Sequence, residues 1–394
     1  MDARTYIKYL IRKVLFNVSG FFVGLVPKKK GVILFTAWFG NKYIDNSKYV
    51  YEYLLNYKEY KPFWMTRRRE IYIRLKKEGK PVAYFNSLKG LLLQIRAEAV
   101  VSSVQFTDYN CWLLTNCIFL DLGHGHPIKD PGACIHSEYM SRVYNDIQSR
   151  VYYYSVVAGS KSKKNVRVVK VPQERLFVSD FARNDVFEDV KLREGKNLSV
   201  EEFKKGRKAI VYMPTHRSDG KKRMEMHEIL PLSEIQKFCE RNDYVFIIKK
   251  HYYHNRERED LSKYSHILDI TNIEDIDPQV LLWQTDILIS DYSACYIDYM
   301  LLKRPLIFFH YDINDFNSNE RHLYYDFEKL NIAPIVYSKD KLVEMIGTVS
   351  SSKDTFLDRR MAFAKENYFD NIGVQEGRKK DKELIDTLFQ KHHG

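Results

Sequence analysis

Cysteine is scarce in this sequence, and its arrangement forms no recognisable site. Only five cysteines occur in 394 residues, with no Cys-x-x-Cys pair and no metal-type spacing: Cys111, Cys117, Cys134, Cys239 and Cys295. Dispersed thiols of this kind are typical of intracellular proteins. The sequence therefore implies no disulfide framework.

The sequence also lacks glycine-rich nucleotide-binding motifs and a membrane-spanning segment. Neither a P-loop nor a G-x-G-x-x-G run is present. The apolar stretch at 14–26 is interrupted by Asn17, Ser19, Gly20 and Gly24, whereas a spanning helix needs about 20 apolar residues. No small-residue cleavage site follows it, so a secretory signal is not expected. Internal repeats, low-complexity segments and nucleic-acid-binding motifs are absent as well.

What is present is the composition of a folded protein with an excess of positive charge. Hydrophobic residues make up 45% and charged residues 29% of the chain, as in globular proteins. A chain of 394 residues exceeds the usual size of one hydrophobic core, so two domains are expected. The net charge of +12 favours an anionic partner, namely nucleic acid, anionic lipid or a phosphorylated substrate.

Residues 1–30 have the pattern of a basic amphipathic helix. Their apolar residues recur at spacings of three and four and form one stripe: Ile7, Leu10, Ile11, Val14, Leu15, Val18, Phe21, Phe22 and Leu25. The basic residues lie off this stripe or close the segment: Arg4, Lys8, Arg12, Lys13, Lys28, Lys29 and Lys30. Such a helix lies in the plane of an anionic membrane surface. We therefore predict membrane contact; the alternative is that the stripe packs on the protein's own core.

From Gly31 onward, short β-rich runs alternate with segments of helical spacing. Strands are expected at 32–36, 62–65, 82–84, 99–103, 118–122, 152–158 and 175–178, and again at 209–213, 244–249, 267–270, 286–290, 305–309 and 333–337. Helices are expected at 43–56, 67–78, 87–97, 227–241, 278–284, 293–302, 339–350 and 354–366. This alternation predicts parallel sheets wrapped by helices.

A polar, highly charged stretch at 188–207 connects two halves of similar size. We therefore predict two doubly wound, Rossmann-like α/β domains facing each other across a cleft, one at 31–195 and one at 205–375. A last helix is expected within 376–394. Ligands bind past the carboxyl ends of the strands in such sheets, so polar residues at strand ends are the candidates for a site.

The strand expected at 118–122 is followed by a histidine-rich turn. His124 is bracketed by glycines, including Gly125, and glycines allow the backbone to approach a ligand closely. An imidazole suits general-base catalysis because its ordinary pKa is near neutral pH. His126 and Lys129 offer additional contacts to phosphate. A lone histidine is more often structural, but this cluster at a strand end favours a functional role.

The strand expected at 286–290 is followed by a serine and a helix. The Ser293 hydroxyl can cap an unpaired amide, and a helix start can bind phosphate; capping alone explains the serine equally well. Asp298 lies within that helix among apolar residues. A carboxylate there is normally paired or functional, because burying it alone is costly.

Two further strand ends carry basic groups. Thr215 and Arg217 follow the strand at 209–213, and arginine can hold phosphate through two hydrogen bonds. His251 follows Lys249 and Lys250 in the same way. Either strand end alone could be a solvated loop. Cationic and imidazole groups at four strand ends together predict a polyanion-binding cleft.

No metal site is predicted. Asp275-Ile-Asp277 has the spacing of a DxD motif, but it directly precedes Pro278. We therefore expect it to cap the next helix rather than to bind a cation.

These motifs resemble those of the CDP-glycerol glycerophosphotransferase family, the teichoic-acid primases and polymerases and related capsule enzymes. The family's His-Gly-Thr-Pro-Leu-Lys motif is matched at 124–129, its Pro-Thr-x-Arg motif at 214–217, and its second histidine at His251. Its Asp-Tyr-Ser-Ser motif, with a helical Asp and Arg-Pro after it, is matched at 291–305. Its Gly-x-Pro-Arg-Asn-Asp turn is matched at 180–185.

The matches run in order over about residues 95 to 330, which makes the resemblance specific. The chain departs from the family pattern at four positions: His126 replaces Thr, Ala294 replaces the second Ser, and Asp180 and Ala182 replace Gly and Pro. These departures bear on which alcohol the donor carries.

The resemblance implies a glycosyltransferase-B-like fold, with 31–195 on the acceptor side and 205–375 binding the donor. It implies transfer of an alditol phosphate, most simply glycerol phosphate, from a CDP-alditol such as CDP-glycerol. The acceptor would be a hydroxyl of an undecaprenyl-diphosphate-linked or polymeric glycan, and CMP would be released. It further implies a peripheral enzyme at the cytoplasmic face of the cell membrane, on an anionic surface, with no metal or other cofactor and no nucleic-acid partner.

The predicted roles follow from this reaction. His124 removes the proton of the acceptor hydroxyl, while His251, Arg217 and the helix start at Ser293 neutralise the donor diphosphate. Asp298 orients a histidine or holds the donor alcohol. The other predicted substrate contacts are Gly125, His126, Lys129, Arg183, Asn184, Thr215 and Asp291.

Two other readings stay open at the level of the sequence. The same cleft would suit a glycosyltransferase that uses a nucleotide sugar. The charge of +12 would also suit a non-catalytic protein that binds a membrane surface or nucleic acid.

Overall fold

The structure is a computed structural model that describes residues 2–129, 137–161, 171–217, 223–251, 254, 259–273, 276–320 and 322–393. The chain divides into two compact units. Unit 1 comprises 1–124, 131–185 and 375–394, and unit 2 comprises 125–130 and 186–374. The sequence predicts the domain boundary between 195 and 205, whereas in the structure unit 2 begins at Val186. The last helix, predicted as a separate segment, packs with unit 1.

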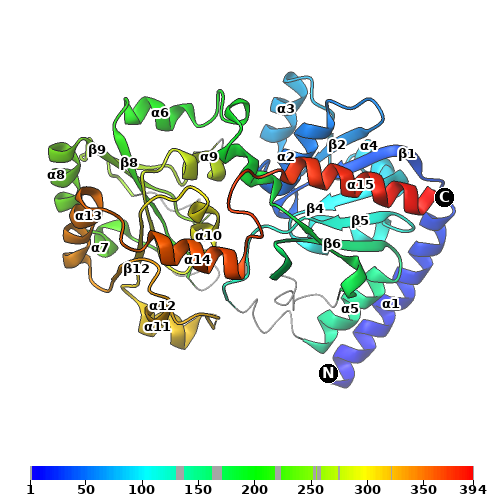
Figure 1. Ribbon diagram of the computed structural model, residues 1–394. Coiled ribbons are helices and arrows are strands. Elements are labelled where there is room, and N and C mark those ends of the chain that lie inside the picture. Colours follow the sequence, from blue (N-terminus) through cyan, green and yellow to red (C-terminus); the bar gives the residue numbers. More distant parts are fainter. Residues whose placement is uncertain are drawn as a thin grey trace. The chain divides into compact units, whose positions relative to one another are not determined.

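Unit 1 is built on one seven-stranded sheet in the order β3-β2-β1-β4-β5-β6-β7, with every pairing parallel (Figure 1). Its strands are β1 (Lys29–Phe35), β2 (Lys61–Thr66), β3 (Val82–Tyr84), β4 (Ala97–Ser102), β5 (Ile118–Asp121), β6 (Tyr152–Ala158) and β7 (Leu176–Ser179). This order is that of a doubly wound sheet, and its direction reverses between β1 and β4, where such sheets bind ligands. All seven strands predicted for this half are confirmed.

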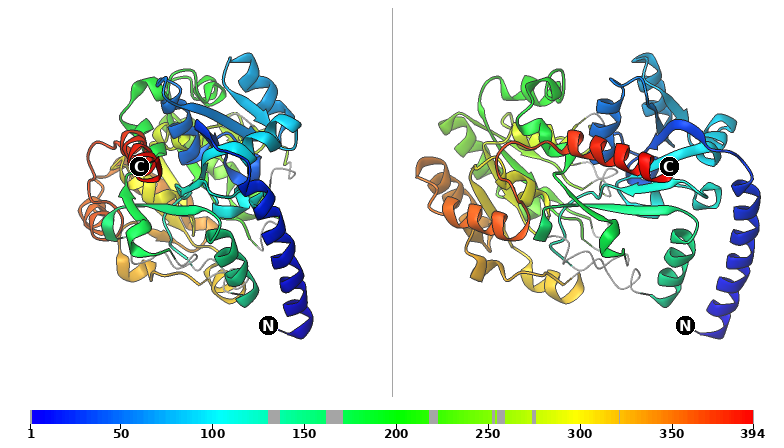
Figure 2. Two further views of the ribbon diagram at one scale, coloured as in Figure 1. Left: turned by 90° about the vertical axis from the view of Figure 1, so that its right-hand side faces the viewer. Right: turned by 45° about the vertical axis from the view of Figure 1, so that its right-hand side comes forward.

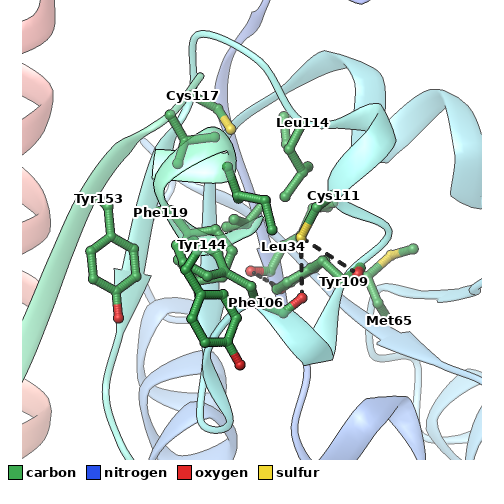
Figure 3. Close-up of a cluster of buried hydrophobic side chains, with 14 of the residues drawn as sticks. Leu34, Met65, Phe106, Tyr109, Cys111, Leu114, Cys117, Phe119, Tyr144 and Tyr153 are labelled. Atoms are coloured by element: carbon green, nitrogen blue, oxygen red, sulfur yellow. Dashed lines mark hydrogen bonds between the residues drawn. The ribbon is translucent and has the colours of Figure 1, made fainter. Parts of the chain in front are cut away.

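Helices cover both faces of the unit 1 sheet. They are α1 (Ala3–Gly24), α2 (Asp45–Leu54), α3 (Arg69–Lys77), α4 (Leu88–Arg96), α5 (Glu138–Gln148) and α15 (Gly377–His393). A buried cluster packs α1 and α5 against one face and includes Leu34, Phe119, Tyr144 and Tyr153 (Figure 3). On the other face, Tyr51 of α2 lies against Phe35, with ring centroids 5.7 Å apart. Runs of buried β-branched and aromatic residues suit strands covered on both sides.

The first helix, α1, packs on unit 1 by a narrow stripe that the sequence pattern did not reveal. Tyr9, Phe16 and Val23, seven residues apart, are its buried residues. The predicted apolar stripe instead lies exposed, with fractional exposures from 41% at Leu10 to 67% at Leu25. Figure 2 shows α1 running along the outside of unit 1 beside α5. None of the helices that the structure describes is long and apolar enough to cross a membrane.

Unit 2 repeats the same strand pattern with six parallel strands in the order β10-β9-β8-β11-β12-β13. They are β8 (Lys208–Met213), β9 (Tyr244–Ile248), β10 (Ile267–Asp269), β11 (Ile287–Ser290), β12 (Leu306–Phe309) and β13 (Ile335–Val336). The direction reverses between β8 and β11, so this pair of strand ends is the expected ligand position. The predicted fold class, two doubly wound parallel sheets, is confirmed.

The helices of unit 2 are α6 (Leu198–Lys204), α7 (Met226–Ile229), α8 (Leu232–Asn242), α9 (Pro278–Trp283), α10 (Cys295–Met300), α11 (Ile313–Asn319), α12 (Phe327–Leu330), α13 (Leu342–Ser351) and α14 (Leu357–Asn367). One apolar cluster packs α7, α8 and α13 on one sheet face, and another packs α6 and α9 on the other. The single helix predicted at 227–241 is two helices that meet at Pro231, because proline lacks the N–H that a continuous helix needs.

Candidate functional site

The candidate base His124 lies just past the end of β5 in unit 1, where its side chain is exposed. Its ring Nδ1 is 2.9 Å from the carbonyl oxygen of Ser103, at the end of β4. A carbonyl oxygen can only accept, so the proton must be on Nδ1, and in the neutral ring Nε2 carries the lone pair. The Trp38 ring packs at a steep angle to the imidazole, with centroids 5.4 Å apart. This geometry presents Nε2 as a proton acceptor.

The backbone that carries His124 is held by the first turn of α2. The Asn46 amide donates to the carbonyl oxygens of Leu122 and Gly123, at 3.1 and 2.9 Å. The Gly123 N–H donates to the Asp121 carboxylate at 3.0 Å, and Gly123 has a φ of +64°, which favours glycine. Burial raises the pKa of Asp121 to about 6. The sequence shows only a run of four polar residues at 45–48, where α2 begins, and no motif marks it as the support of His124.

Arg183, predicted to bind substrate, instead braces this turn from inside unit 1. Its guanidinium donates to the His124 carbonyl oxygen at 2.6 Å and to the Asp45 carboxylate at 2.8 Å. Asp45 also accepts from the Trp38 indole at 3.0 Å. Both Asp45 and Trp38 have positive φ, +72° and +52°, which is strained for residues other than glycine. Arg183 is buried and thus acts on His124 rather than on a ligand.

The rest of the predicted turn at 180–185 anchors the helix α15 to unit 1. Asp185 accepts from the Gly377 and Arg378 backbone at 2.8 and 3.0 Å and from the Arg378 guanidinium at 2.8 Å. Asp180, where the family has glycine, accepts from the Lys380 ammonium at 2.7 Å. Asn184 is fully buried in the same turn. These residues have structural contacts in unit 1.

In unit 2, Arg217 joins the ends of the two central strands. Its guanidinium donates to Asp291 at 2.9 Å and to both oxygens of Asp312, at 2.7 and 3.0 Å. It also lies over the rings of Tyr292 and Phe316. With 1% of its surface exposed, it has no face to offer a phosphate. The prediction of a direct Arg217–phosphate contact is therefore not supported by this arrangement.

Thr215 and Asp291 belong to the same junction. The Thr215 N–H donates to Asp291 at 2.8 Å, and the Thr215 carbonyl oxygen accepts from Arg217 at 2.7 Å. Asp291 is fully buried. Asp312, which motif analysis did not single out, completes the junction; it follows β12 and carries no sequence motif.

His126 and Asp298 lie close together in unit 2. The Nε2 of His126 lies 3.9 Å from the Asp298 carboxylate, and both side chains are buried. The Gln279 amide donates to the same carboxylate at 3.4 Å. The rings of Tyr368 and Phe369 enclose the imidazole, with centroids at 4.8 and 5.0 Å. This pair anchors the segment 125–130 in unit 2.

Lys129 extends from that anchored segment toward the end of β11. Its ammonium is 3.3 Å from the carbonyl oxygen of Tyr292, and it lies close enough to His251 to act on its ionisation. Gly125, the predicted point of close backbone approach, begins the segment that packs with unit 2. The sequence prediction that Lys129 belongs with the strand-end cations is thus consistent with its position.

His251 is at the centre of a basic cluster in unit 2. Its ring centroid is 4.7 Å from that of His216. Burial lowers the pKa of His251, and the nearby His216, Lys249, Lys129 and His254, in that order, lower it further, to about 2 in all. The imidazole is therefore neutral when no anion is present. His251 can neutralise negative charge, as predicted for it, only after its imidazole takes up a proton.

Ser293 lies two residues before α10, and its hydroxyl contacts the first amide of that helix. The helix begins at Cys295 with Ala294 as its N-cap, and the Ser293 hydroxyl accepts from the Cys295 N–H at 3.5 Å. Ser293 is half-buried, so its hydroxyl is accessible at the end of β11. The serine hydroxyl therefore accepts from an amide at the start of the helix, as predicted, although Ala294 is the assigned N-cap.

The structure gives one group of metal-ligating side chains among the described residues: Glu225, His227 and Glu259. Glu259 already accepts from the backbone of Met226 and His227, at 2.7 and 2.9 Å, and from the His227 ring at 2.6 Å. These bonds anchor the start of α7. Asp277 caps α9 as predicted, accepting from Gln279 N–H at 3.0 Å, whereas Asp275 lies outside the described residues.

Comparison with known proteins gives consistent matches. The sequence model described as CDP-Glycerol:Poly(glycerophosphate) glycerophosphotransferase matches residues 20–382. The chain is 26% identical over 384 residues to a teichoic acid poly(glycerol phosphate) polymerase of Bacillus subtilis, covering 93% of this chain and 49% of that protein. It is 26% identical over 384 residues to a teichoic acid glycerol-phosphate transferase of Staphylococcus aureus, covering 92% of this chain and 93% of that protein. The chain thus spans about half the length of the first relative and nearly all of the second.

Solved structures share the fold. The wall teichoic acid polymerase TagF superposes with a TM-score of 0.76 at 21% identity, covering 100% of both chains. A TagF variant soaked with CDPG gives a TM-score of 0.76 at 22% identity, covering 99% of this chain and 98% of that one. UDP-GlcNAc 2-epimerase from Neisseria meningitidis gives 0.56 at 11% identity, covering 93% of this chain and 100% of that one. The fold is therefore of the glycosyltransferase-B-like kind.

Proposed function

The chain belongs to the CDP-glycerol:poly(glycerophosphate) glycerophosphotransferase family, and from this premise we propose that it transfers glycerol phosphate from CDP-glycerol to a hydroxyl of a surface-glycan acceptor. The observation that carries the proposal is the orientation of His124, whose Nδ1 is fixed by the Ser103 carbonyl at 2.9 Å. A histidine held in one tautomer at a strand end is a group built for proton transfer. The reaction it serves is an enzymatic phosphoryl transfer of teichoic-acid type.

In the proposed reaction the acceptor oxygen attacks the phosphorus that bears glycerol. A new O–P bond forms, the bond from that phosphorus to the bridging oxygen breaks, and CMP leaves with the electron pair. His124 Nε2 takes the proton of the acceptor hydroxyl. Such transfers depend mainly on positioning and on stabilising charge at the transferred and leaving oxygens.

We assign the donor phosphates to the basic cluster at the carboxyl ends of β8, β9 and β11. Lys129, Lys249 and His251 lie there, and the Ser293 hydroxyl adds a hydrogen-bonding group. Arg217 and Asp298 hold this edge in place from beneath it, through Asp291 and His126 respectively. Ligand-binding residues and positioning residues are thus distinct sets in unit 2.

We further propose that α1 places the enzyme on a membrane that carries its lipid-linked acceptor. Its outward stripe is apolar and exposed, with Phe21, Phe22 and Leu25 each more than 60% exposed. Basic residues accompany it, including the exposed Lys8 and Lys30. An amphipathic helix of this kind binds the boundary between headgroups and acyl chains. The acceptor on that surface is a glycan, lipid-linked or polymeric.

The test is to offer the purified full chain CDP-glycerol, CDP-ribitol, UDP-sugars and GDP-sugars, each with a teichoic-acid-type acceptor. CMP released from a CDP-alditol only in the presence of the acceptor supports the proposal, and the better CDP substrate identifies the alditol. Release of UDP or GDP instead would establish a glycosyltransferase. No nucleotide release with any donor would leave a non-catalytic surface-binding protein.

A further inference from the structure

His216 has no part in the reaction described so far, yet it lies against a residue of the donor cluster. It follows β8, and His251 follows the neighbouring strand β9. Their ring centroids are 4.7 Å apart with an interplanar angle of 53°. Two imidazoles at this separation compete for a single proton, because a charge on one disfavours a charge on the other.

Besides His216, the main charged groups that act on His251 are cationic or imidazole. Lys249 directly follows β9, His254 follows His251, and Lys129 comes from the segment 125–130. Each of them disfavours protonation of His251, in addition to burial. Without a bound anion, two ammonium groups therefore lie near His251, whose imidazole has little tendency to protonate.

We infer that the His216–His251 pair takes up one proton when the donor diphosphate binds, so that His216 is a further donor-binding residue. This inference rests on the proposed function for the identity of the donor. A diphosphate between the lysines reverses the sign of the local electrostatic potential. Each negative charge at about 4 Å raises the pKa of an imidazole by roughly three units in a partly buried site.

The inference has a measurable consequence for affinity. If the loaded site holds one more proton than the empty site, the donor Kd must rise with pH, by up to about tenfold per unit. The effect needs the phosphates, because the cytosine and ribose carry no charge at neutral pH. A nucleoside without phosphate should therefore bind without uptake of a proton.

The test is isothermal titration calorimetry of the full chain with CDP-glycerol at pH 7.5, in Tris and in HEPES. These buffers differ in ionisation enthalpy, so the difference between the two binding enthalpies counts the protons exchanged. We expect uptake of about one proton per donor and none with cytidine. Equal enthalpies in both buffers would overturn the inference and leave the proposed function standing. Absence of CDP-glycerol binding would overturn both.

Variants separate His216 from the other titrating groups. His216→Asn should reduce the proton uptake by at least half and raise the donor Kd about tenfold at pH 6.5, with a smaller effect at pH 9. His266→Asn is the matched control, because His266 precedes β10 and lies at the opposite, amino edge of the sheet; its proton uptake should equal that of the wild type. A His216→Asn protein that melts normally and keeps full uptake would remove His216 from the site.

Discussion

At the scale of single residues, the support of His124 is mainly backbone and amide rather than carboxylate. The Ser103 carbonyl fixes the ring, and Asn46 and Arg183 fix the chain on either side of it. A carbonyl partner orients the imidazole without adding a full negative charge beside it. The buried Asp121 carboxyl interacts with His124 through its charge but is not the hydrogen-bond partner of the ring.

Removing this imidazole should stop the chemistry and spare donor binding. His124→Ala should lower acceptor-dependent CMP release by about 10² to 10⁴-fold, because the proton acceptor is lost. The donor Kd measured by calorimetry should stay near the wild-type value, since the basic cluster belongs to unit 2. His322→Ala, at an exposed histidine, serves as the control. Near-normal turnover in the His124 variant would exclude it as the base.

Asp121 beneath His124 gives a prediction about pH. Its pKa is raised by burial to about 6, above the ordinary value near 4. The folded state therefore holds the proton more tightly, and this carboxyl lowers stability as pH rises from about 4 to 6. Asp121→Asn should raise the free energy of unfolding by up to about 3 kcal/mol at pH 8 and by little at pH 4. Urea melts at both pH values test this, and equal effects at both would contradict it.

At the scale of elements, one arginine ties three segments of unit 2 together. Arg217 links the ends of β8 and β11, through Asp291, to the start of α11, through Asp312. Its burial makes the two carboxylates dependent on it, because an unpaired buried charge is costly. The junction fixes the edge of the sheet on which the basic cluster stands.

We expect loss of Arg217 to act on stability first. Arg217→Ala should lower the free energy of unfolding of unit 2 by about 3 to 5 kcal/mol, since it strands two carboxylates. Donor affinity should fall as a consequence of the loosened edge. Ser293→Ala provides the contrast, because it should weaken donor binding modestly, by about 1 kcal/mol, without changing the melting temperature. If Arg217→Ala left the melting temperature unchanged, the result would favour the earlier prediction that the guanidinium binds the donor phosphates directly.

Most elements were predictable because their cause is local. A short, continuous apolar run such as 209–213 is typical of a strand covered by helices on both faces of a parallel sheet. The other strands of the two sheets have runs of the same kind. Other features have non-local causes. The short helix α6 buries a single residue, Val200, and so leaves no periodic signal. The tautomer of His124 depends on a carbonyl oxygen 21 residues away, and no side-chain motif encodes that contact. Arg217 matches a motif, but its two carboxylate partners decide its role.

At the scale of the whole molecule, α1 has two faces with opposite requirements. Phe16 is completely buried. Its ring centroid is 5.4 Å from that of Trp112 and 4.0 Å from Cζ of Arg150. On the outward face of the same helix, Ile11, Leu15 and Phe22 are each more than half exposed. The two alternatives left open by the sequence, core packing and an outward apolar surface, thus describe different faces of one helix.

Substitutions on the two faces should separate these roles. Replacing Ile11, Leu15 and Phe22 by Ser should release the protein from anionic vesicles in a flotation assay without lowering its melting temperature. Added salt should weaken binding of the unaltered protein, because each Lys or Arg near the surface contributes about 1 kcal/mol and is screened beyond roughly 10 Å. Activity on a short soluble acceptor should persist.

The buried face gives the matched control. Phe16→Ala should lower the free energy of unfolding by about 3 to 5 kcal/mol, while vesicle binding by the folded protein persists. For the same reason, deletion of residues 1–30 should destabilise unit 1 rather than merely detach it from lipid. If the exposed-face variant bound vesicles like the wild type, the stripe would serve another partner.

The return of residues 375–394 to unit 1 has a consequence for synthesis. Gly377 packs so closely on Ala182 that a Cβ there would come within 2.6 Å of its backbone, and Asp185 binds the first turn of α15. A ribosome delivers this helix only after it has made every strand of unit 2. Domains generally fold as units during synthesis, but this first unit must wait for the last part of the chain. While unit 2 is being made, the surfaces of α2 and β7 that α15 covers are therefore exposed, and chaperones that bind apolar surfaces have that interval in which to act.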